Sequence, residues 1–203
     1  MKLHLMKDFL SKPHHLTRCS KMKVIGIDPG TVVTGYACIE ITAPSRAIKL
    51  LDLGIIRPPK SPRLSLRYHT IYESILTLLD RFKPDAVAIE TPFIQKNAQS
   101  ALKLGGAMGS ILIAAEKHKI SAFGYAPREV KKGVFGTGTA SKEEIQRYLS
   151  LFLRLDQSAL TKLDATDALA IAIHHLQEVT KAMTRRISKT TKTDETLSHP
   201  NLL

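Results

Sequence analysis

The sequence predicts a mixed α/β fold, in which a sheet begins with β-hairpins, continues with βα units and is flanked by helices. The first observation is that three strand-like segments, 24–28, 34–41 and 47–57, follow one another at short spacing, which favours antiparallel hairpins. The second is that later short apolar strands alternate with longer segments of helical periodicity. The third is a hydrophobic content of 43% in 203 residues, which is enough for one domain with a buried core.

The first half of the chain gives the following elements. Pro29 and Gly30 predict the turn between the first two strands. Leucines and isoleucines near helical spacing predict a helix over 64–82, and the apolar stretch AVAIE over 86–90 predicts a short buried strand. A long helix is expected over 98–119, and three glycines leave a flat stripe on it that another element can approach closely. These glycines are Gly105, Gly106 and Gly109.

The second half continues the alternation of strands and helices. The segment ISAFGYA over 120–126 predicts the next strand. Ser141 is a favourable helix N-cap, and two glutamates follow it in the first turn, where the helix dipole favours negative charge. A helix is therefore expected over 142–153, and a last helix over about 164–180.

Both ends of the chain are expected to lie outside the folded domain, which is placed at 23–180. Residues 1–22 contain five Lys or Arg against one Asp and lack the apolar core of a signal peptide. A mitochondrial presequence is one interpretation of this basic extension, but a true start at Met22 is favoured. Residues 181–203 are polar, basic and rich in Thr, so they are expected to form a disordered tail.

Charge and cysteine content restrict the partners and the compartment. The formal net charge is +12 and the pI is near 9.8, which favours a polyanionic partner; the alternative is a charge that only keeps the protein in solution. Cys19 and Cys38 do not form a disulfide framework, so a reducing, cytoplasmic location is expected. No apolar run approaches the roughly 18–20 residues of a membrane span.

Four carboxylates occupy positions where a solvated charge is unusual. Asp28 and Glu90 each end a buried strand, and the carboxyl ends of strands are where open α/β sheets place their sites. Asp164 and Asp167 are three residues apart on one face of the last helix, which continues as an apolar and largely buried segment. Each acid alone could be a turn residue, a helix cap or part of a solvated face. Together they predict a site.

The four acids predict a metal centre. Carboxylates at close range repel one another strongly, and divalent cations would neutralise them. Hard oxygen ligands suit Mg²⁺, with Mn²⁺ as a substitute, and two such ions can clamp the attacking and leaving oxygens of a phosphodiester. One or two ions per subunit are therefore expected.

Four sequence blocks resemble the bacterial RuvC-type Holliday junction resolvases. The blocks are IGIDPGTVVTGYA, AIETPFIQKNAQSALKLG, YAPREVKKGVFGTGTASK and DATDALAIAI, and they occur in the order found in that family. The resemblance implies a ribonuclease H-like fold, a homodimer and Mg²⁺-dependent nicking of two opposed strands of four-way junction DNA during recombination and repair. The family's catalytic, metal-binding acids match Asp28, Glu90, Asp164 and Asp167.

The same resemblance implies DNA-binding residues outside the acid cluster. Phe93 matches an aromatic residue that stacks on unpaired bases at the crossover, with core packing as the alternative. Lys131 and Lys142 match basic residues near the scissile phosphate, with solvated lysines as the alternative. His174 and His175, further along the last helix, are not assigned to the site. A partner of the branch-migration motor type, of the RuvA and RuvB kind, is implied by the resemblance alone.

Other classes of protein fit parts of the sequence. IGIDPGT also resembles the first phosphate loop of actin and Hsp70 ATPases, but those proteins need two such domains and a cleft between them. An RNA-processing nuclease of the same fold is a second alternative. A junction-binding protein without catalysis is a third, although all four acids are present here.

Overall fold

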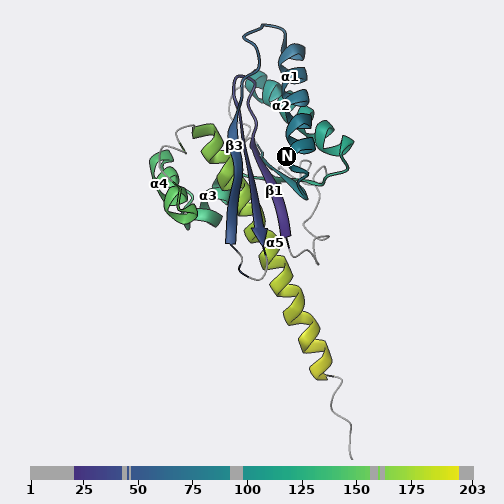
Figure 1. The fold of residues 1–203 in the computed structure, drawn as a ribbon, viewed down its shortest axis with the longest axis vertical. Coiled ribbons are helices and arrows are strands. Elements are labelled where there is room, and N and C mark those ends of the chain that lie inside the picture. Colours follow the sequence, from purple (N-terminus) through teal and green to yellow (C-terminus); the bar gives the residue numbers. More distant parts are fainter. Residues whose placement is uncertain are drawn as a thin grey trace, which may run out of the picture.

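The computed structural model describes residues 21–42, 45, 47–91, 98–155, 160 and 163–196 (Figure 1). The strands in these residues are β1 (Lys21–Asp28), β2 (Thr34–Thr42), β3 (Ala47–Ile56), β4 (Ala86–Glu90) and β5 (Ala122–Tyr125). The helices are α1 (Leu64–Phe82), α2 (Ala98–Lys117), α3 (Pro127–Phe135), α4 (Lys142–Leu153) and α5 (Leu163–Thr196).

The strands form one mixed sheet in the order β3-β2-β1-β4-β5. β1, β2 and β3 pair antiparallel as consecutive hairpins, while β4 pairs parallel to β1 and β5 pairs parallel to β4. The predicted order of hairpins first and βα units afterwards is therefore confirmed. In this order β1 is central, and it has a parallel neighbour on one side and an antiparallel neighbour on the other.

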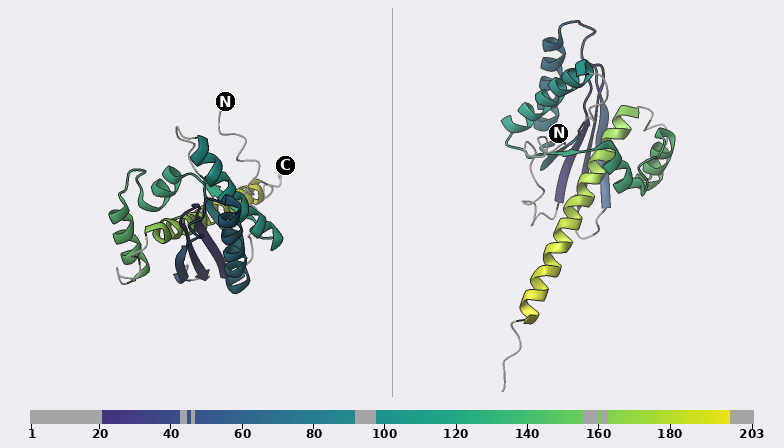
Figure 2. Two further views of the ribbon diagram at one scale, coloured as in Figure 1. Left: turned by 90° about the horizontal axis from the view of Figure 1, so that it is seen from above. Right: turned by 180° about the vertical axis from the view of Figure 1, so that it is seen from behind.

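Helices cover both faces of the sheet, and each face has its own core. Side chains alternate along a strand, so Val24 of β1 packs in the core that contains α5, whereas Ile25 and Ile27 pack in the core that contains α1 and α2. α3 and α4 join the α5 core. Figure 2 shows α5 running along the sheet and continuing beyond it.

α5 lies unusually close to the sheet because glycines face it. A Cβ at Gly26 of β1 would collide with the backbone oxygen of Ala168 and would lie 2.9 Å from the Cβ of Ala172. A Cβ at Gly35 of β2 would collide with the backbone oxygen of Asp164. Only glycine permits this contact of backbone with backbone. The start of α5 is thereby fixed against β1 and β2.

Three details differ from the sequence-based expectation. α3 is a helix that was not predicted, although Pro127 at its first turn and Glu129 three residues after its N-cap are typical helix-start signals. α5 continues to Thr196, past the expected end near residue 180. β1 already begins at Lys21, and Met22 is buried opposite Ile41.

The predicted start of α4 is confirmed. The Ser141 side chain accepts a hydrogen bond from the backbone N–H of Glu144 at 3.2 Å, and the Glu144 carboxylate accepts one from the backbone N–H of Ser141 at 2.7 Å. These bonds hold the pKa of Glu144 below its ordinary value. The reciprocal cap stabilises the first turn of the helix that Lys142 begins.

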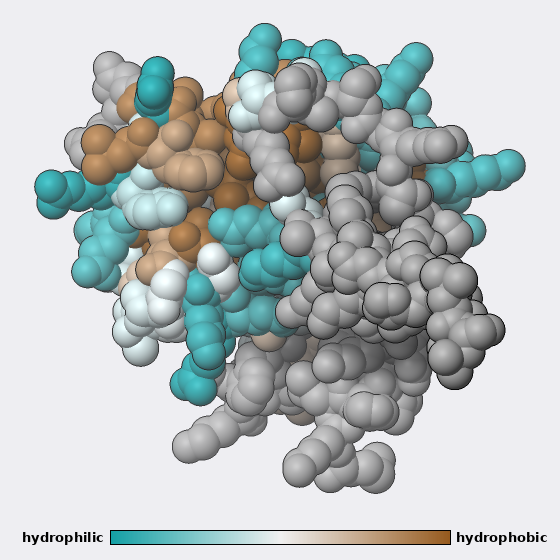
Figure 3. Space-filling view, turned by 90° about the horizontal axis from the view of Figure 1, so that it is seen from below, coloured by the Kyte–Doolittle hydropathy of each residue, from teal (hydrophilic) through white to brown (hydrophobic). Residues whose placement is uncertain are grey.

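Large hydrophobic side chains also reach the surface. Figure 3 shows one face, on which brown apolar areas lie between teal hydrophilic side chains. Among the described residues, the exposed large hydrophobic side chains are Val32, Leu66, Leu102, Ile113, Tyr148, Leu151 and Phe152. Two of them lie on α2 and three on α4, so exposed apolar surface is concentrated on these two helices.

Candidate active site

Asp28 and Glu90 are the last residues of two neighbouring strands. β1 and β4 run parallel with Ile27 opposite Ile89, so the residues that follow, Asp28 and Glu90, lie side by side at the carboxyl end of the sheet. Because side chains alternate, both project to the same face as the residues two positions before them, which is the α5 face. Both side chains are half-buried.

α5 brings two further carboxylates to this end of the sheet. Gly35 pairs with Asp28 across the β1–β2 ladder, and Gly35 also lies against the backbone of Asp164. The first turn of α5 therefore lies beside the strand end that carries Asp28. Asp167 follows three residues later and shares the helix face of Asp164. Both aspartates are half-buried.

The turn that follows Asp28 is closed by a buried threonine. The hydroxyl of Thr34 donates to the backbone oxygen of Gly30 at 2.7 Å and accepts from the backbone N–H of Gly30 at 3.2 Å. Thr34 is fully buried. Because these bonds fix the loop between β1 and β2, they also fix the direction in which the chain leaves Asp28. Thr34 was not identified from the sequence, and its position four residues after Gly30 is the only signal for this role.

The four acids offer the donor set of a hard divalent cation. Carboxylate oxygens are the usual ligands of Mg²⁺ and Mn²⁺, and acids from β1, β4 and α5 reach one end of one sheet face. Within the described part of the chain, however, no group of three or more potential ligands is already gathered closely enough to hold an ion. The backbone arrangement fits a metal centre, because it places acids from three elements at the same end of one sheet face.

The three residues expected to bind DNA are described by the structure to different extents. Lys131 lies on α3 and is half-buried, and its Nζ donates to the backbone oxygen of Ala140 at 2.9 Å. This bond ties α3 to the loop before α4 and uses one of three ammonium donors. Lys142 is the first residue of α4, and its side chain lies outside the described part of the structure. Phe93 lies outside the described residues altogether.

A buried polar cluster next to Glu90 was not found from the sequence. Tyr125 pairs with Glu90 at the end of β5, and its hydroxyl shares a 2.7 Å hydrogen bond with Nδ1 of His175. His174 packs its ring against the Tyr125 ring, edge to face, at 4.8 Å between centroids. Burial raises the pKa of Tyr125 above its ordinary value, and burial together with His174 lowers the pKa of His175 to about 4. Tyr125 and His175 are therefore both neutral near neutral pH.

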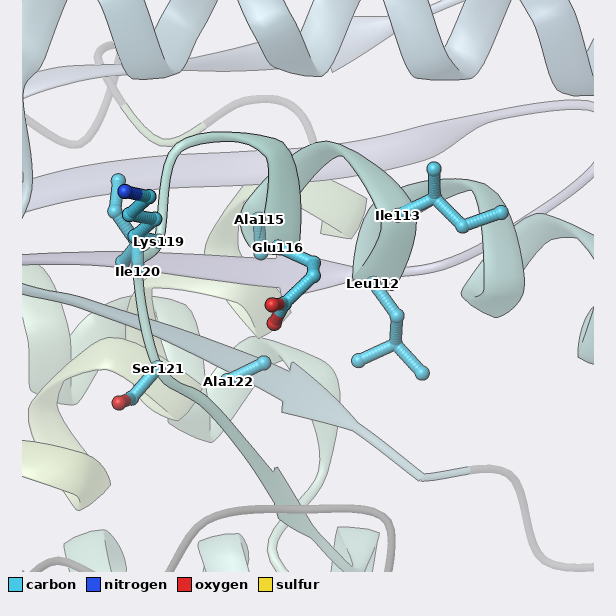
Figure 4. Close-up of a pocket in the computed structure, with 8 residues that line it drawn as sticks. All are labelled: Leu112, Ile113, Ala115, Glu116, Lys119, Ile120, Ser121 and Ala122. Atoms are coloured by element: carbon cyan, nitrogen blue, oxygen red, sulfur yellow. The ribbon is translucent and has the colours of Figure 1, made fainter.

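One hollow in the described surface lies away from this site. It has a volume of about 460 Å³ and is lined by residues at the end of α2 and the start of β5 (Figure 4). The start of β5 is the sheet end opposite to Glu90, because β5 runs parallel to β4. Ala122 and Ser121 lie there, together with Glu116 and Lys119. The hollow is therefore separate from the carboxylates.

A mixed sheet of this order, with carboxylates at the ends of its central strands and on a helix packed across them, defines a nuclease of the ribonuclease H-like class. The expected fold is thus confirmed. The chain belongs to the RuvC family of crossover junction endodeoxyribonucleases, because the family model "Crossover junction endodeoxyribonuclease RuvC" matches residues 24–175.

Individual relatives agree with this membership. The crossover junction endodeoxyribonuclease RuvC of Protochlamydia amoebophila is 44% identical over 154 residues, which is 76% of this chain and 90% of the relative. That of Photorhabdus laumondii is 47% identical over 152 residues, which is 75% of this chain and 85% of the relative.

Solved structures show the same fold. Thermus thermophilus RuvC in complex with a Holliday junction substrate superposes with a TM-score of 0.73 at 31% identity, covering 80% of this chain and 97% of that one. The yeast mitochondrial Holliday junction resolvase Ydc2 superposes with a TM-score of 0.66 over 89% of this chain and 87% of that one. At 13% identity this second likeness concerns the fold alone. In the part of the chain that the structure describes, no helix is long and apolar enough to span a membrane.

Proposed function

We propose that this chain resolves four-way DNA junctions by paired, metal-dependent nicking of two opposed strands. The observation that carries the proposal is the convergence of acids from β1, β4 and α5 on one end of the sheet in a member of this family. The net charge of +12 supports a phosphate-rich substrate. A solved structure of Thermus thermophilus RuvC is a complex with Holliday junction substrate.

Family membership implies a metal cofactor. The residues that would hold it are Asp28, Glu90, Asp164 and Asp167, as one or two Mg²⁺ ions with Mn²⁺ as a substitute. Bound there, the metal would supply Lewis-acid activation at the scissile phosphodiester. The side chains are carried by different elements, so the chain itself provides the spacing between them: the β1–β4 register sets Asp28 beside Glu90, and Gly35 sets α5 beside both.

The basic and aromatic residues have separate proposed roles. Lys131 and Lys142 stabilise the negative charge that develops at the phosphate. Lys131 remains tied to Ala140 through one donor and keeps two others for DNA. Phe93 stacks on an opened base at the crossover, where such stacking is worth about 1–3 kcal/mol.

The experiment that tests this function is a nicking assay on a synthetic four-way junction with and without Mg²⁺. Linear duplex, a Y-fork and an RNA·DNA hybrid serve as controls. We expect symmetric nicks in the junction, few in the duplex and none without metal. Cleavage of the hybrid in preference to the junction would instead favour an RNA-processing nuclease of the same fold.

Replacing each of the four acids by its amide tests the site. Asp28→Asn, Glu90→Gln, Asp164→Asn and Asp167→Asn keep the shape of the side chain but lose the charge that binds metal, so each should lower the nicking rate by at least about a hundredfold. Junction binding, measured by fluorescence polarisation, should stay the same or tighten. Asp80→Asn is the matched control, since Asp80 is an exposed acid on α1 paired with His118 at 2.8 Å. Full nicking by Asp167→Asn would remove that residue from the site.

We also propose a homodimer formed mainly through α2, because paired nicks need two sites related by a two-fold axis. Leu102 is 78% and Ile113 is 63% exposed on this helix. Gly105 and Gly109 lie between them on the same helix face, and a Cβ at either glycine would meet nothing within 4 Å. The four residues form an open apolar stripe. Gly106, in contrast, faces Tyr68 of α1, so it does not belong to this stripe.

Substitution of the stripe tests the dimer. Ile113→Glu places a charge in the proposed interface and should convert the protein to a monomer in sedimentation velocity at micromolar concentration. Leu151→Glu on α4 is the matched control, because Leu151 is 71% exposed and lies outside the stripe. Paired nicking by a strictly monomeric wild-type protein would contradict the dimer.

The remaining associations are proposed from family membership. A branch-migration motor of the RuvA and RuvB type would deliver the junction, and the cytoplasm is the expected compartment. The buried free thiol of Cys38 agrees with a reducing environment.

A further inference from the structure

His174 and Gly133 form a contact between the helix that carries two of the acids and the helix that carries Lys131. His174 lies on α5 and is 2% exposed. Gly133 lies in the middle of α3, and a Cβ there would collide with Nδ1 of His174 and would lie 2.6 Å from its Cε1. The imidazole therefore occupies the space that a side chain of α3 would need.

The position of His174 on α5 relates it to the acids. His174 follows Asp167 by seven residues, so the two share one helix face about 10 Å apart along the axis. Its ring also packs on Tyr125, which pairs with Glu90. His174 thus contacts α3 on one side and the strand end beside Glu90 on the other.

The imidazole is held there without hydrogen bonds. Among the residues whose side chains are described, neither ring nitrogen of His174 has a hydrogen-bond partner, and Oε1 of Glu129 on α3 lies 3.9 Å from its Nε2. Buried polar atoms without partners are costly and uncommon. A plain apolar side chain would fill the space at lower cost, and such exceptions are concentrated at functional sites.

α3 transmits this contact to the two lysines. Lys131 lies two residues before Gly133 on α3, and its Nζ bonds the backbone of Ala140. Ala140 is followed by Ser141, the N-cap from which α4 begins at Lys142. A change in the distance between α3 and α5 would therefore displace both lysines relative to the acids on α5.

We infer that His174 is a positioning residue, which sets the α3–α5 spacing through its contact with Gly133 and so aligns Lys131 and Lys142 with the carboxylates. Because the side chain of His174 is buried, this role requires no contact of its own with DNA. The inference rests on the proposed function, because the alignment matters only if the lysines act at the phosphate.

The test is a reciprocal pair of substitutions. Gly133→Ala inserts a methyl group against the imidazole and should lower the single-turnover nicking rate at least tenfold, with junction affinity changed less than threefold. His174→Ala removes the imidazole and should lower the rate about threefold to tenfold. In the double variant the methyl group enters the space left by the ring, so its rate should return to that of His174→Ala.

Gly138→Ala is the matched control. It adds the same methyl group at a position where the nearest atom is the backbone oxygen of Arg128 at 3.7 Å, an ordinary contact. Its nicking rate should equal that of the wild type. Because alanine favours helices over glycine, Gly133→Ala should even be more stable than the wild type if the contact were unimportant.

Three results would overturn the inference while wild-type junction nicking stays intact. They are wild-type rates for Gly133→Ala, a parallel loss of nicking and junction binding, and a double variant no faster than Gly133→Ala. If Gly133→Ala does not fold, recovery of a folded, nicking double variant still supports the contact, and its failure overturns it. Absence of junction nicking by the wild type would instead overturn the proposed function.

Discussion

The two faces of the sheet are packed with side chains of different size. The face under α1 and α2 is filled with large aliphatic side chains, among them Ile25, Ile75 and Ile89, which are fully buried. The face under α5 uses glycine and alanine, so that the backbone of the helix touches the backbone of the sheet at Gly26 and Gly35. The carboxylates and the buried histidines lie on the second face.

This difference gives the two faces separate roles. One face mainly stabilises the fold, and the other determines the position of α5. Large side chains bury much apolar area, and one can be exchanged for another of similar volume at modest cost. A contact between two backbones leaves no side chain that can rearrange, so the position of α5 is determined by the course of the strands. Acids that must converge from separate elements need that kind of contact.

Gly35→Ala should have the largest effect, because its methyl group would meet the backbone of Asp164 and move α5. We expect a loss of stability of about 3 kcal/mol and a fall in nicking of about a hundredfold, the cost of roughly 1 Å of misplacement. Urea unfolding and single-turnover nicking measure the two effects. Gly54→Ala is the control, since the three atoms nearest to its methyl group would belong to the side chain of Tyr36, the hydroxyl at 2.7 Å, and none of them to backbone. Equal losses of stability and of nicking rate in Gly35→Ala and Gly54→Ala would contradict a special role for the contact between the backbones of β2 and α5.

Acidification should weaken the α5 face next. The pKa of His175 is lowered from 6.5 to about 4, so between these values the unfolded chain binds a proton that the folded chain does not. Stability is therefore complete above pH 6.5 and falls by up to roughly 3 kcal/mol as the pH drops to about 4. The measurement is urea unfolding across this range, with His175→Gln expected to give a flatter profile. Identical slopes for both proteins would refute this role of His175.

Ile75→Val should have the smallest effect. It tests the face of the sheet that α1 and α2 cover. Removing one methylene from this fully buried side chain should cost about 1 kcal/mol. The nicking rate of the folded protein should be unchanged, because the α1 core does not touch α5. A loss of nicking beyond the loss of folded protein would show that both faces position the acids.

The sequence predicted much of the fold because its signals were local. The helices 64–82 and 142–153 have the bounds that were expected, because apolar periodicity and the Ser141 cap are signals that lie within the helix or next to it. α3 was not predicted because its start signals, Pro127 and Glu129, follow a strand without an intervening loop. The length of α5 was underestimated because its polar end has no apolar stripe to extend the pattern.

The candidate site depends less on local sequence signals than the fold does. Asp28 and Glu90 stand out because each ends a buried strand, and the family resemblance matched them, together with Asp164 and Asp167, to catalytic acids. The contacts of Gly35, Tyr125 and His174 were not predicted, since they are made with residues more than thirty positions away. No local sequence pattern predicts a contact between residues so far apart in the chain. The shared face of Asp28 and Glu90 needed only strand alternation, but the approach of Asp164 needed the structure.

The placement of the acids also bears on when the protein can act during its synthesis. Asp28 ends the first strand and Asp167 lies near the start of the last helix, and Gly35 must meet Asp164 before the four acids are together. A ribosome-bound chain that ends before α5 can form its hairpins but lacks half of the carboxylates. If the four acids form the active site as proposed, nuclease activity requires the start of α5, and a nascent chain that ends before it should not cut DNA.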